Sequence, residues 1–550
     1  MLTILLIMAI TGQGQSWDSL GESFVTIFPE NIAFYYPLSP VNALNITAVL
    51  PNTVVEVFIS GQLTYTNTLP AGKPVTVTLP VDIEEYQFGE TSQTVRISST
   101  KRIVVQSISK KADSVQTNVI QPQKNLGTIY TIPLLNYRQM IKTFYQSARN
   151  VSKRYSSFRL VIINGEDRIN NVRIVKRPTD EIYILDPFTA LQLQTDGTET
   201  EIYSDYKVAV MLTHPCVEVE ECRCNMVLNQ LYPDAQWDSR FVVPSILNTS
   251  NFWLHVTSSM KTSANGGDLE SSTVDAYSSK LLSLPSLQLG SQFINTSNPA
   301  SLRLVSPSGI IIEPISQYRF SACYLVPVSS TDAKALIIAE TYYRDSVYID
   351  NDLLLSTKWS PIANSVYSSV SVSLDDTHII WHPSTKIAVY VFEKSTNVYG
   401  GPAISLSAKP DPLGCAFVPS KFDIIVTPQT WPESHQYCKL MSDELFSPSN
   451  EEAQEEMTNI LNNEAWSNTS SCSNQLSWKP QSDRDAVSSY LHVIGLLGAV
   501  SGELWKTLHH GIPRKHCLLP STGVLQHAPN YCFLRQHPRL NHHQLHKSVL

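Results

Sequence analysis

Between Phe24 and about Ser395, apolar and polar residues alternate in short runs that are rich in Val, Ile, Thr and Tyr. Examples are Val54–Ile59 and Val366–Val372. A period of two with β-branched residues is typical of half-buried β-strands, and turn pairs such as Asn164-Gly165 separate the runs. Helical periodicity is nearly absent from this stretch. The region is therefore predicted to be all-β.

The same region contains an internal repeat. Three segments share an aromatic residue, a β-branched residue and a proline: Tyr130–Pro133, Phe241–Pro244 and Tyr324–Pro327. Three later strands begin with Ser and a basic residue: Ser99–Val105, Ser204–Val210 and Ser384–Val389. The basic residue is interpreted as protection for an exposed strand edge. The repeat predicts four tandem β-sandwich-like units within residues 20–410, with a propeller-like assembly as the alternative. Their predicted ranges are 24–111, 130–216, 241–314 and 324–395.

The pattern changes after Pro410. Residues 450–461 predict a helix with acidic residues in its first turn, which suits the helix dipole. From about residue 479 to residue 550 neither periodicity is sustained and histidine becomes frequent, so a disordered or poorly packed tail is expected. A metal site in this tail is the less favoured alternative, because the histidines within Asn541–His546 lack partnered Cys or carboxylate ligands at an ordered spacing.

The N-terminus predicts secretion. Leu2–Ile10 is apolar but too short to span a bilayer, which takes about 20 apolar residues. Gly12 and Gly14 match the small residues that precede a signal-peptidase cut, so residues 1–14 are predicted to be a signal peptide. The alternative is a buried first strand. With a mean hydropathy of −0.09 and no second long apolar run, a polytopic membrane protein is excluded.

Two further sequence features agree with secretion. Five Asn-x-Ser/Thr sequons are predicted to carry glycans in surface turns: Asn45, Asn150, Asn248, Asn295 and Asn468. Nine cysteines are present, and seven of them are candidates for disulfides: Cys216, Cys222, Cys224, Cys323, Cys415, Cys438 and Cys472. An odd number leaves at least one free or intermolecular thiol.

The cysteine cluster around residue 216 has two interpretations. With His214 nearby, the three cysteines Cys216, Cys222 and Cys224 could form a zinc site, but an oxidising compartment favours disulfides. Cys216 is expected to close a small loop with Cys222 or Cys224. The remaining cysteine is expected to reach Cys323.

Composition and motifs argue against catalysis and nucleic-acid binding. The net charge is −8 with a pI of about 6.0, so there is no broad basic surface for nucleic acid. Nucleophile-elbow, zincin, phosphate-loop and dinucleotide motifs are absent from the sequence. The carboxylate pair Glu84-Glu85 is expected to be solvated in a turn. His378 and His382 are expected to be a surface or strand-end pair, which is favoured over a metal or acid/base site. We therefore predict a protein that is not an enzyme and has no cofactor.

Several motifs of the β-repeat region follow one another in a characteristic order. They are Gly21–Asn31, the Ser-x-Lys/Arg strands, and then Cys216, Cys222, Gln230–Pro233, Trp237 and Phe241–Pro244. With these motifs the region resembles the N-terminal domain of the IgGFc-binding protein family. The resemblance covers roughly residues 20–400 and implies secretion, often into mucus, and binding of the immunoglobulin Fc region. Where that family usually has Gly after the tryptophan, this chain has Asp238.

A second resemblance covers residues 413–478. Trp431–Cys438 and the predicted helix after it resemble the first part of a C-type lectin-like domain. The Glu-Pro-Asn or Gln-Pro-Asp loop and the Trp-Asn-Asp motif of calcium-dependent lectins are absent after Trp431, so calcium-dependent sugar binding is not expected.

Together these features predict a secreted extracellular or mucosal binding protein with a protein or glycoprotein partner, immunoglobulin Fc among them. A carbohydrate-binding lectin-like receptor and a structural mucus or matrix scaffold are the alternatives. Trp237, Trp359 and Trp381 are candidate interface anchors, with core packing favoured for each.

Overall fold

A computed structural model describes residues 17–415, except for gaps at 34–38, 113, 134, 137–139, 141–156, 177, 196, 221–222, 247–251, 268, 307–309, 331, 356–357, 395–397 and 413. Beyond them it describes residues 422–425, 517–518 and 532–535. The chain divides into two compact parts, residues 1–418 and residues 419–550. None of the helices in the described part has the length and apolarity to cross a membrane. The predicted signal peptide lies outside the described residues.

The second part contains one small antiparallel sheet, in which β37 (Cys532–Arg535) lies between β35 (Phe422–Ile425) and β36 (Cys517–Leu518). Six residues of the tail that we expected to be disordered or poorly packed are therefore in strands. The remaining tail lies outside the described residues. So do the predicted helix at 450–461, Cys438 and Cys472, on which the lectin-like prediction depends.

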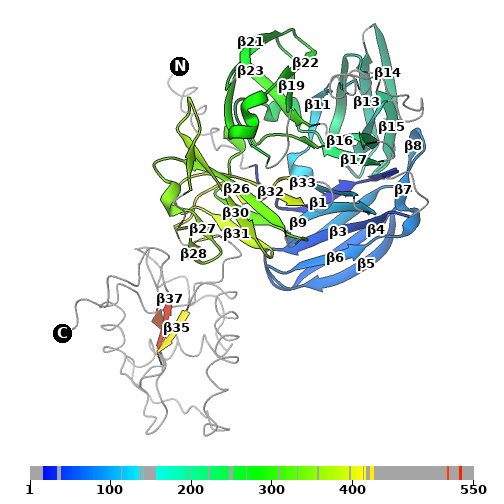
Figure 1. Ribbon diagram of the computed structural model, residues 1–550. Coiled ribbons are helices and arrows are strands. Elements are labelled where there is room, and N and C mark those ends of the chain that lie inside the picture. Colours follow the sequence, from blue (N-terminus) through cyan, green and yellow to red (C-terminus); the bar gives the residue numbers. More distant parts are fainter. Residues whose placement is uncertain are drawn as a thin grey trace, which may run out of the picture. The chain divides into compact units, whose positions relative to one another are not determined.

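The first part confirms the all-β prediction, since its regular elements are strands joined by short 3-10 helices. Four units follow one another along the chain (Figure 1). Unit 1 contains β1 (Gly21–Thr26), β3 (Val41–Ala48), β4 (Thr53–Ile59), β5 (Gln62–Leu69), β6 (Pro74–Thr78), β9 (Val95–Lys111) and β10 (Ser114–Val119). Unit 2 contains β11 (Gly127–Thr131), β12 (Phe158–Asn164), β13 (Asn170–Lys176), β14 (Thr179–Leu185), β15 (Ala190–Thr195), β16 (Thr200–Glu220) and β17 (Arg223–Gln230).

The other two units follow the same order. Unit 3 contains β18 (Asp238–Val243), β19 (Trp253–Ser258), β20 (Thr262–Gly266), β21 (Leu269–Val274), β22 (Ser278–Ser283), β23 (Gln292–Val305) and β24 (Ile311–Ile312). Unit 4 contains β25 (Cys323–Val326), β26 (Ala333–Glu340), β27 (Tyr348–Ile349), β28 (Asp352–Leu353), β29 (Ser360–Pro361), β30 (Tyr367–Leu374), β31 (His378–Trp381), β32 (Ala388–Lys394) and β33 (Val398–Pro402). Two short strands, β2 (Phe28–Pro29) and β7 (Glu84–Glu85), pair with each other beside unit 1, and β34 (Ile404–Ser407) follows unit 4. A third short strand that precedes β9 in the chain, β8 (Gly89–Thr91), pairs with β15 at the edge of the unit 2 sheet.

One long strand organises each unit. In unit 1 the first half of β9 pairs with β1 and β4, and its second half pairs with β3 and β10. The long strands of units 2 and 3, β16 and β23, pair with the equivalent strands of their own units. In unit 4 the long strand is split into β31 and β32, but the equivalent partners pair with each half. Each unit is thus a curled antiparallel sheet that packs on an apolar core. Units 1 and 2 each have their own core cluster, whereas units 3 and 4 share one.

A bulge bends each long strand at the same place. Gly21 pairs with Ile103, but Ser23 pairs with Ser98, so residues 99–102 are excluded from the ladder. The equivalent bulges are residues 204–207, 296–299 and 382–386. Our interpretation of the basic residues as edge protection is wrong, because they occupy these bulges in the middle of the sheet. There Lys101 donates to the Pro51 carbonyl at 2.9 Å instead.

The four units close into a ring around a shared axis. β10, β17, β24 and β33 occupy equivalent positions in their units and contact one another, and we call this region the hub. Figure 1 labels two of these strands, β17 and β33, near the centre of the ring. Gln121 N–H donates to the Gln230 side-chain oxygen at 3.0 Å, and Tyr390 donates to the Val242 carbonyl at 3.3 Å. This closure around an axis is the feature that a propeller-like assembly would have.

Three 3-10 turns connect the units: η2 (Gln123–Asn125), η4 (Asp234–Gln236) and η6 (Gln317–Arg319). The residue before each turn contacts the first strand of the preceding unit. A Cβ on Gly21 would lie 2.3 Å from Pro122 Cβ, and a Cβ on Gly127 would lie 2.3 Å from Pro233 Cβ. Glycine is required at both positions because the proline ring occupies the space of a side chain.

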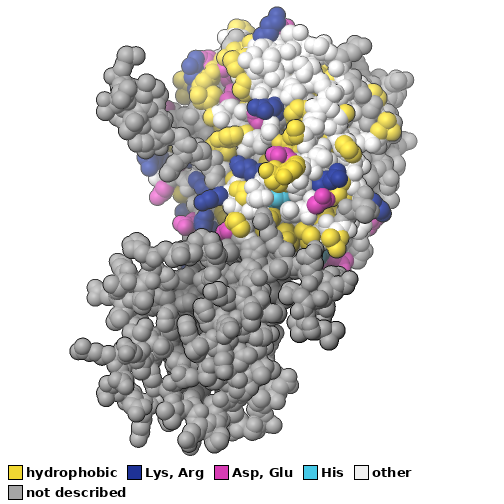
Figure 2. Space-filling model, turned by 90° about the vertical axis from the view of Figure 1, so that its left-hand side faces the viewer, with side chains coloured by type: hydrophobic (Ala, Val, Ile, Leu, Met, Phe, Trp, Pro, Cys, Tyr) yellow, Lys and Arg dark blue, Asp and Glu magenta, His cyan; other side chains and the backbone are white. Residues whose placement is uncertain are grey.

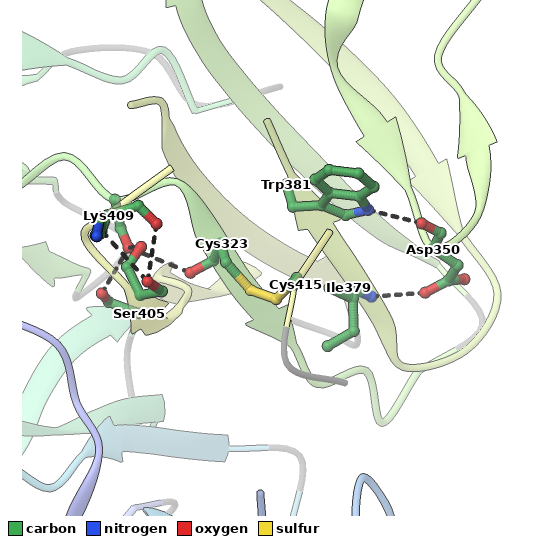
Figure 3. The surroundings of a disulfide bond; sticks show 9 residues. Cys323, Asp350, Ile379, Trp381, Ser405, Lys409 and Cys415 are labelled. Atoms are coloured by element: carbon green, nitrogen blue, oxygen red, sulfur yellow. Dashed lines mark hydrogen bonds between the residues drawn. A yellow bond between two sulfur atoms is a disulfide. The ribbon is translucent and has the colours of Figure 1, made fainter. Parts of the chain in front are cut away.

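The fourth junction, between units 4 and 1, is a seam without chain continuity. Ser19 N–H donates to the Ser405 carbonyl at 2.8 Å. Around it Leu20, Val49 and Val104 of unit 1 pack with the apolar side chains that unit 4 and β34 contribute, which are Leu325, Tyr348, Ile379, Trp381, Ile404 and Leu406. Figure 3 shows the disulfide between Cys323 and Cys415 beside this seam. The bond ties the segment after β34 to the first strand of unit 4.

Candidate binding surface

One side of the ring carries both the bulges and the loops that face them. We call this side the loop face. It comprises residues 49–52 and 99–102 in unit 1, 165–169 and 204–207 in unit 2, 259–261 and 296–299 in unit 3, and 341–346 and 382–386 in unit 4. The loop and the bulge lie together because β3, β12, β19 and β26 all end beside the bulge of their own unit. Since equivalent strands meet at the hub, the four pairs lie on the same side of the ring.

Hydrogen bonds fix each loop to its bulge. Gly165 N–H donates to the Lys207 carbonyl at 3.4 Å, and the Asn298 side-chain amide donates to the Lys261 carbonyl at 2.8 Å. The loop face is therefore built on strand ends and held by the sheet, which is the arrangement that positions binding residues precisely.

The tips of these loops expose apolar side chains. Ile169 is 57% exposed, Met260 47% and Tyr342 86%. The Arg168 guanidinium lies 4.7 Å from the ring centre of Tyr206, which is also exposed. Tyrosine, arginine and methionine are enriched at protein interfaces because they offer apolar area together with hydrogen-bonding groups.

His382 holds the tyrosine loop of unit 4 in place. Its Nδ1 accepts the N–H groups of Ser384 and Thr385 at 3.1 and 3.0 Å, and its Nε2 lies 2.9 Å from the Tyr343 carbonyl oxygen. The ring is fully buried. His378 begins β31 and His382 follows its last residue, so the prediction of a surface or strand-end pair holds in its strand-end form, while the bulge folds the His382 ring beneath the loop. The rings of Tyr342 and Tyr343 meet edge to face at 4.9 Å.

A groove of about 450 Å³ opens on the loop face between units 1 and 2. Its charged lining is mixed, with Arg102, Lys124 and Lys207 against Glu22 and Glu166. Lys124 pairs with Asp18 at 2.5 Å, and Lys207 donates to the Lys124 carbonyl at 2.8 Å. The face of the ring that Figure 2 shows also carries basic, acidic and hydrophobic side chains intermixed, with no broad region of one sign. Such a surface suits a protein partner better than a polyanion.

The three tryptophans are not exposed anchors. Trp381 is buried, stacks on Tyr348 at 4.7 Å between ring centres and donates to the Asp350 carbonyl at 2.7 Å (Figure 3). Trp237 and Trp359 are partly buried, and Trp359 packs against the core of units 3 and 4. The exposed tyrosines at 342 and 343 were missed because period-two alternation predicts strands and is silent about the loops between them.

His378 lies at the surface between two carboxylates. Its Nδ1 is 2.6 Å from Asp350 Oδ2 and its Nε2 is 3.2 Å from Asp375 Oδ1. Burial lowers the pKa of His378, but the hydrogen bonds to these two carboxylates outweigh burial and raise it overall. The arrangement braces the loop before β28. In the described ranges, no cluster of three or more His, Cys, Asp or Glu side chains is arranged to hold a metal ion.

On the side of the ring opposite the loop face, Glu84 and Glu85 depart from the predicted surface position. Glu85 is buried and accepts the N–H of Gln87 at 2.7 Å. Burial raises the pKa of Glu84 to about 7, although a hydrogen bond from Asn42 and the charge of Lys111 act against the rise. These groups lie where unit 1 meets unit 2, close to the ion pair between Arg159 and Glu30.

The disulfide prediction is resolved for four cysteines. Cys216 pairs with Cys224, with 5.1 Å between their Cα atoms, so the cluster closes a small loop as expected. Cys323 pairs with Cys415, not with a cysteine of that cluster. The expectation for Cys323 is therefore wrong, because the seam brings the end of the ring next to β25. Cys222 lies outside the described residues.

Two of the five sequons fall on described strands. Asn45 in β3 and Asn295 in β23 are both half-buried. Asn150, Asn248 and Asn468 lie outside the described residues. Glycosylation stays a prediction at all five positions.

Comparison with known proteins identifies the family. The family model for IgGFc binding protein matches residues 116–392, which is just over half of the chain and runs from β10 to β32. The chain belongs to the IgGFc-binding protein family. The human IgGFc-binding protein is 24% identical over 384 residues, which cover 65% of this chain and 7% of that protein. The chain therefore spans a small fraction of its human relative.

This IgGFc-binding family member has weak counterparts among solved structures. The BSP domain of a biofilm-associated protein covers 72% of the chain and 97% of its own at 7% identity, with a TM-score of 0.12. A Ca²⁺-stabilised adhesin with which an Antarctic bacterium binds ice covers 70% and 99% at 10% identity, with a TM-score of 0.11. Scores this low carry no argument about fold or function. The family match ends before the lectin-like segment.

Proposed function

We propose that the chain is a secreted, non-enzymatic binding protein that engages a protein or glycoprotein through the loop face of its ring, with immunoglobulin Fc as the first candidate. The observation that carries the proposal is the family match over units 2 to 4, together with the human relative whose name records binding of IgG Fc. Two disulfides and five sequons support an extracellular location.

The loop face supports the proposal because it combines exposed apolar tips with a rigid frame. Ile169, Met260 and Tyr342 come from three different units, so a partner that spans the ring would contact all three. The mixed charge of the groove between units 1 and 2 would add polar contacts at the rim.

Surface plasmon resonance with immobilised Fc, and with Fab as the control ligand, tests this proposal. The triple variant Ile169→Ser, Met260→Ser, Tyr342→Ser is expected to weaken binding at least about tenfold, since truncated interface anchors often cost more than 1 kcal/mol each. A matched control is Val81→Ser with Leu289→Ser. These two side chains are similarly exposed, at 67% and 84%, but lie near the starts of β3 and β19 on the opposite side of the ring.

Unchanged binding by the triple variant, with loss in the control, would remove the loop face from the proposal. No binding of Fc at micromolar concentration would exclude Fc as the partner. Recovery from mucus that depends on glycans would then favour the carbohydrate-binding alternative, and disulfide-linked multimers would favour the scaffold.

A further inference from the structure

A small cavity lies on the axis of the ring, where the three turns and the seam converge. Ser19, Asn125, Gln236 and Arg319 all line it. These four residues are equivalent, because each lies two positions before the residue that faces its unit's bulge. The cavity has a volume of about 40 Å³. Since one water needs roughly 10–15 Å³ on this measure, the cavity has room for a small ion or molecule.

Three of the four residues, Ser19, Asn125 and Gln236, are uncharged. The side-chain amides of the two that come from the first two turns already have hydrogen-bond acceptors. The Asn125 amide donates to the Asp18 carbonyl at 2.7 Å, and the Gln236 amide donates to the Asn125 carbonyl at 2.6 Å. Arg319 differs because it brings a positive charge to the axis. Its guanidinium carbon lies 3.3 Å from the ring centre of Tyr232, and its Nη1 is 3.7 Å from Glu313 Oε1, which is longer than a hydrogen bond.

The buried charges near the axis do not balance. Glu313 also faces Arg303, whose Nη2 is 3.5 Å from Glu313 Oε2. The three side chains are between 2% and 10% exposed, so two guanidinium groups share one carboxylate in a dry setting. Among the described residues that line the cavity, none carries a carboxylate. An unbalanced buried charge is costly unless another group compensates it.

One residue of the cavity lining, Trp17, has an unused donor. Trp17 Nε1 is buried and has no hydrogen-bond acceptor in the structure. An indole N–H can only donate, and a guanidinium can only donate. Together they bring two donor groups and a positive charge to the lining, which is the chemistry that selects an anion.

We infer that the axial cavity binds one small monovalent anion, chloride or a short carboxylate, between Trp17 and Arg319. The site joins the N-terminal segment to the turn between units 3 and 4, so occupancy stabilises the closed ring. The inference is independent of the function proposed above, because the cavity lies within the ring and its argument uses none of the loop-face tips.

The first test is crystallographic. Crystals of the full chain soaked in sodium bromide are expected to show an anomalous peak in the cavity, in contact with Trp17 Nε1 and the Arg319 guanidinium. A cavity that holds only water under these conditions would overturn the inference.

The second test is a chloride titration followed by thermal unfolding, with ionic strength held constant by sodium gluconate, whose anion is too large for the cavity. The melting temperature of the native chain is expected to rise and saturate. Arg319→Gln, which copies Gln236 at the equivalent position of the turn between units 2 and 3, is expected to abolish the rise. Arg173→Gln, which removes an exposed arginine paired with Asp180, is the matched control and keeps it.

Trp17→Phe keeps the inference testable if Arg319→Gln fails to fold. This variant retains an aromatic ring but loses the N–H donor, so the chloride concentration at half-saturation is expected to rise about tenfold, the usual effect of one lost hydrogen bond. An identical chloride response in the native chain and Trp17→Phe would contradict the site.

Discussion

The junctions between units 1 and 2 and between units 2 and 3 set a glycine against a proline, whereas the junction between units 3 and 4 sets Asp238 against Ser316. An equivalent backbone bridge joins Phe24 to Pro122 at the first of these junctions and Phe241 to Ser316 at the third. Where the proline ring is absent there is room for a side chain, and Asp238 uses it to accept the Tyr318 N–H at 3.0 Å. Two substitutions far apart in the sequence therefore compensate each other.

This comparison explains the departure from the family pattern at Asp238. Glycine is needed at this position only while the facing residue is proline. Considered alone, Asp238 departs from the glycine that the contact with proline requires. Together with Ser316 in place of that proline, it forms the same junction in a different way.

The largest expected effect comes from comparing the disulfide beside the seam with the disulfide that closes a small loop within unit 2. Cys323→Ser with Cys415→Ser opens a link over 92 residues, and Cys216→Ser with Cys224→Ser opens one over 8. Loop-closure entropy gives losses of about 5 and about 2.5 kcal/mol in the free energy of unfolding. Urea denaturation of both variants measures the difference, and equal losses would show that the seam disulfide adds nothing through chain closure.

The next test breaks a glycine–proline junction directly. Gly127→Ala places a Cβ against Pro233 and is expected to lower the free energy of unfolding by about 3 kcal/mol through overpacking. Adding Pro233→Ser, which copies unit 3, should recover most of that loss in the same denaturation experiment.

Gly401→Ala serves as the control for this pair, because a Cβ there meets nothing within 4 Å. If Pro233→Ser failed to rescue Gly127→Ala, the compensation between these two positions would be refuted.

A pH series singles out the contact between units 1 and 2, where Glu84 lies near Lys111. Its pKa of about 7 in the folded chain exceeds the usual 4.5, so the native state binds more protons between these values. The free energy of unfolding should fall by about 2 kcal/mol from this group as the pH rises from about 4.5 to 7.

Glu84→Gln should remove that part of the pH dependence. The measurement is the difference between the native chain and the variant in urea denaturation at pH 5 and pH 8. A difference that does not change with pH would contradict the raised pKa.

The smallest expected effect compares units that have tyrosine with units that have phenylalanine at the bulge. Tyr130 Oη accepts the Gly127 N–H at 2.9 Å and donates to the Val208 carbonyl at 2.7 Å, and Tyr324 does the same in unit 4. Phe24 and Phe241 take the place in units 1 and 3. Tyr130→Phe is expected to cost about 1 kcal/mol by calorimetry. A cost no larger than that of Tyr342→Phe on the surface would show the hydroxyl to be dispensable.

The repeat and the all-β fold were predictable because the core-facing strands alternate. Leu160, Ile162 and Val210 point into one core and produce the pattern on which the prediction rests. The hub strands were less visible. Asn118, Asn229 and Gln230 face other polar groups at the axis, so β10 and β17 lack the apolar alternation that marks a strand.

The candidate site was predictable only at the level of the family. The glycine and proline positions are conspicuous in the sequence, but their meaning depends on which residue faces which across a junction. The partner of Cys323 likewise follows from ring closure, a contact between distant parts of the chain that no local pattern encodes.

The seam also has a consequence for synthesis. Because its two sides are Ser19 and Ser405, the ring cannot close until nearly the whole first part has left the ribosome. Until then Leu20, Val49 and Val104 lack their apolar partners from unit 4. The nascent chain therefore exposes these apolar side chains until synthesis has passed Ser405. Chaperones that shield them until then would govern the yield of correctly folded protein.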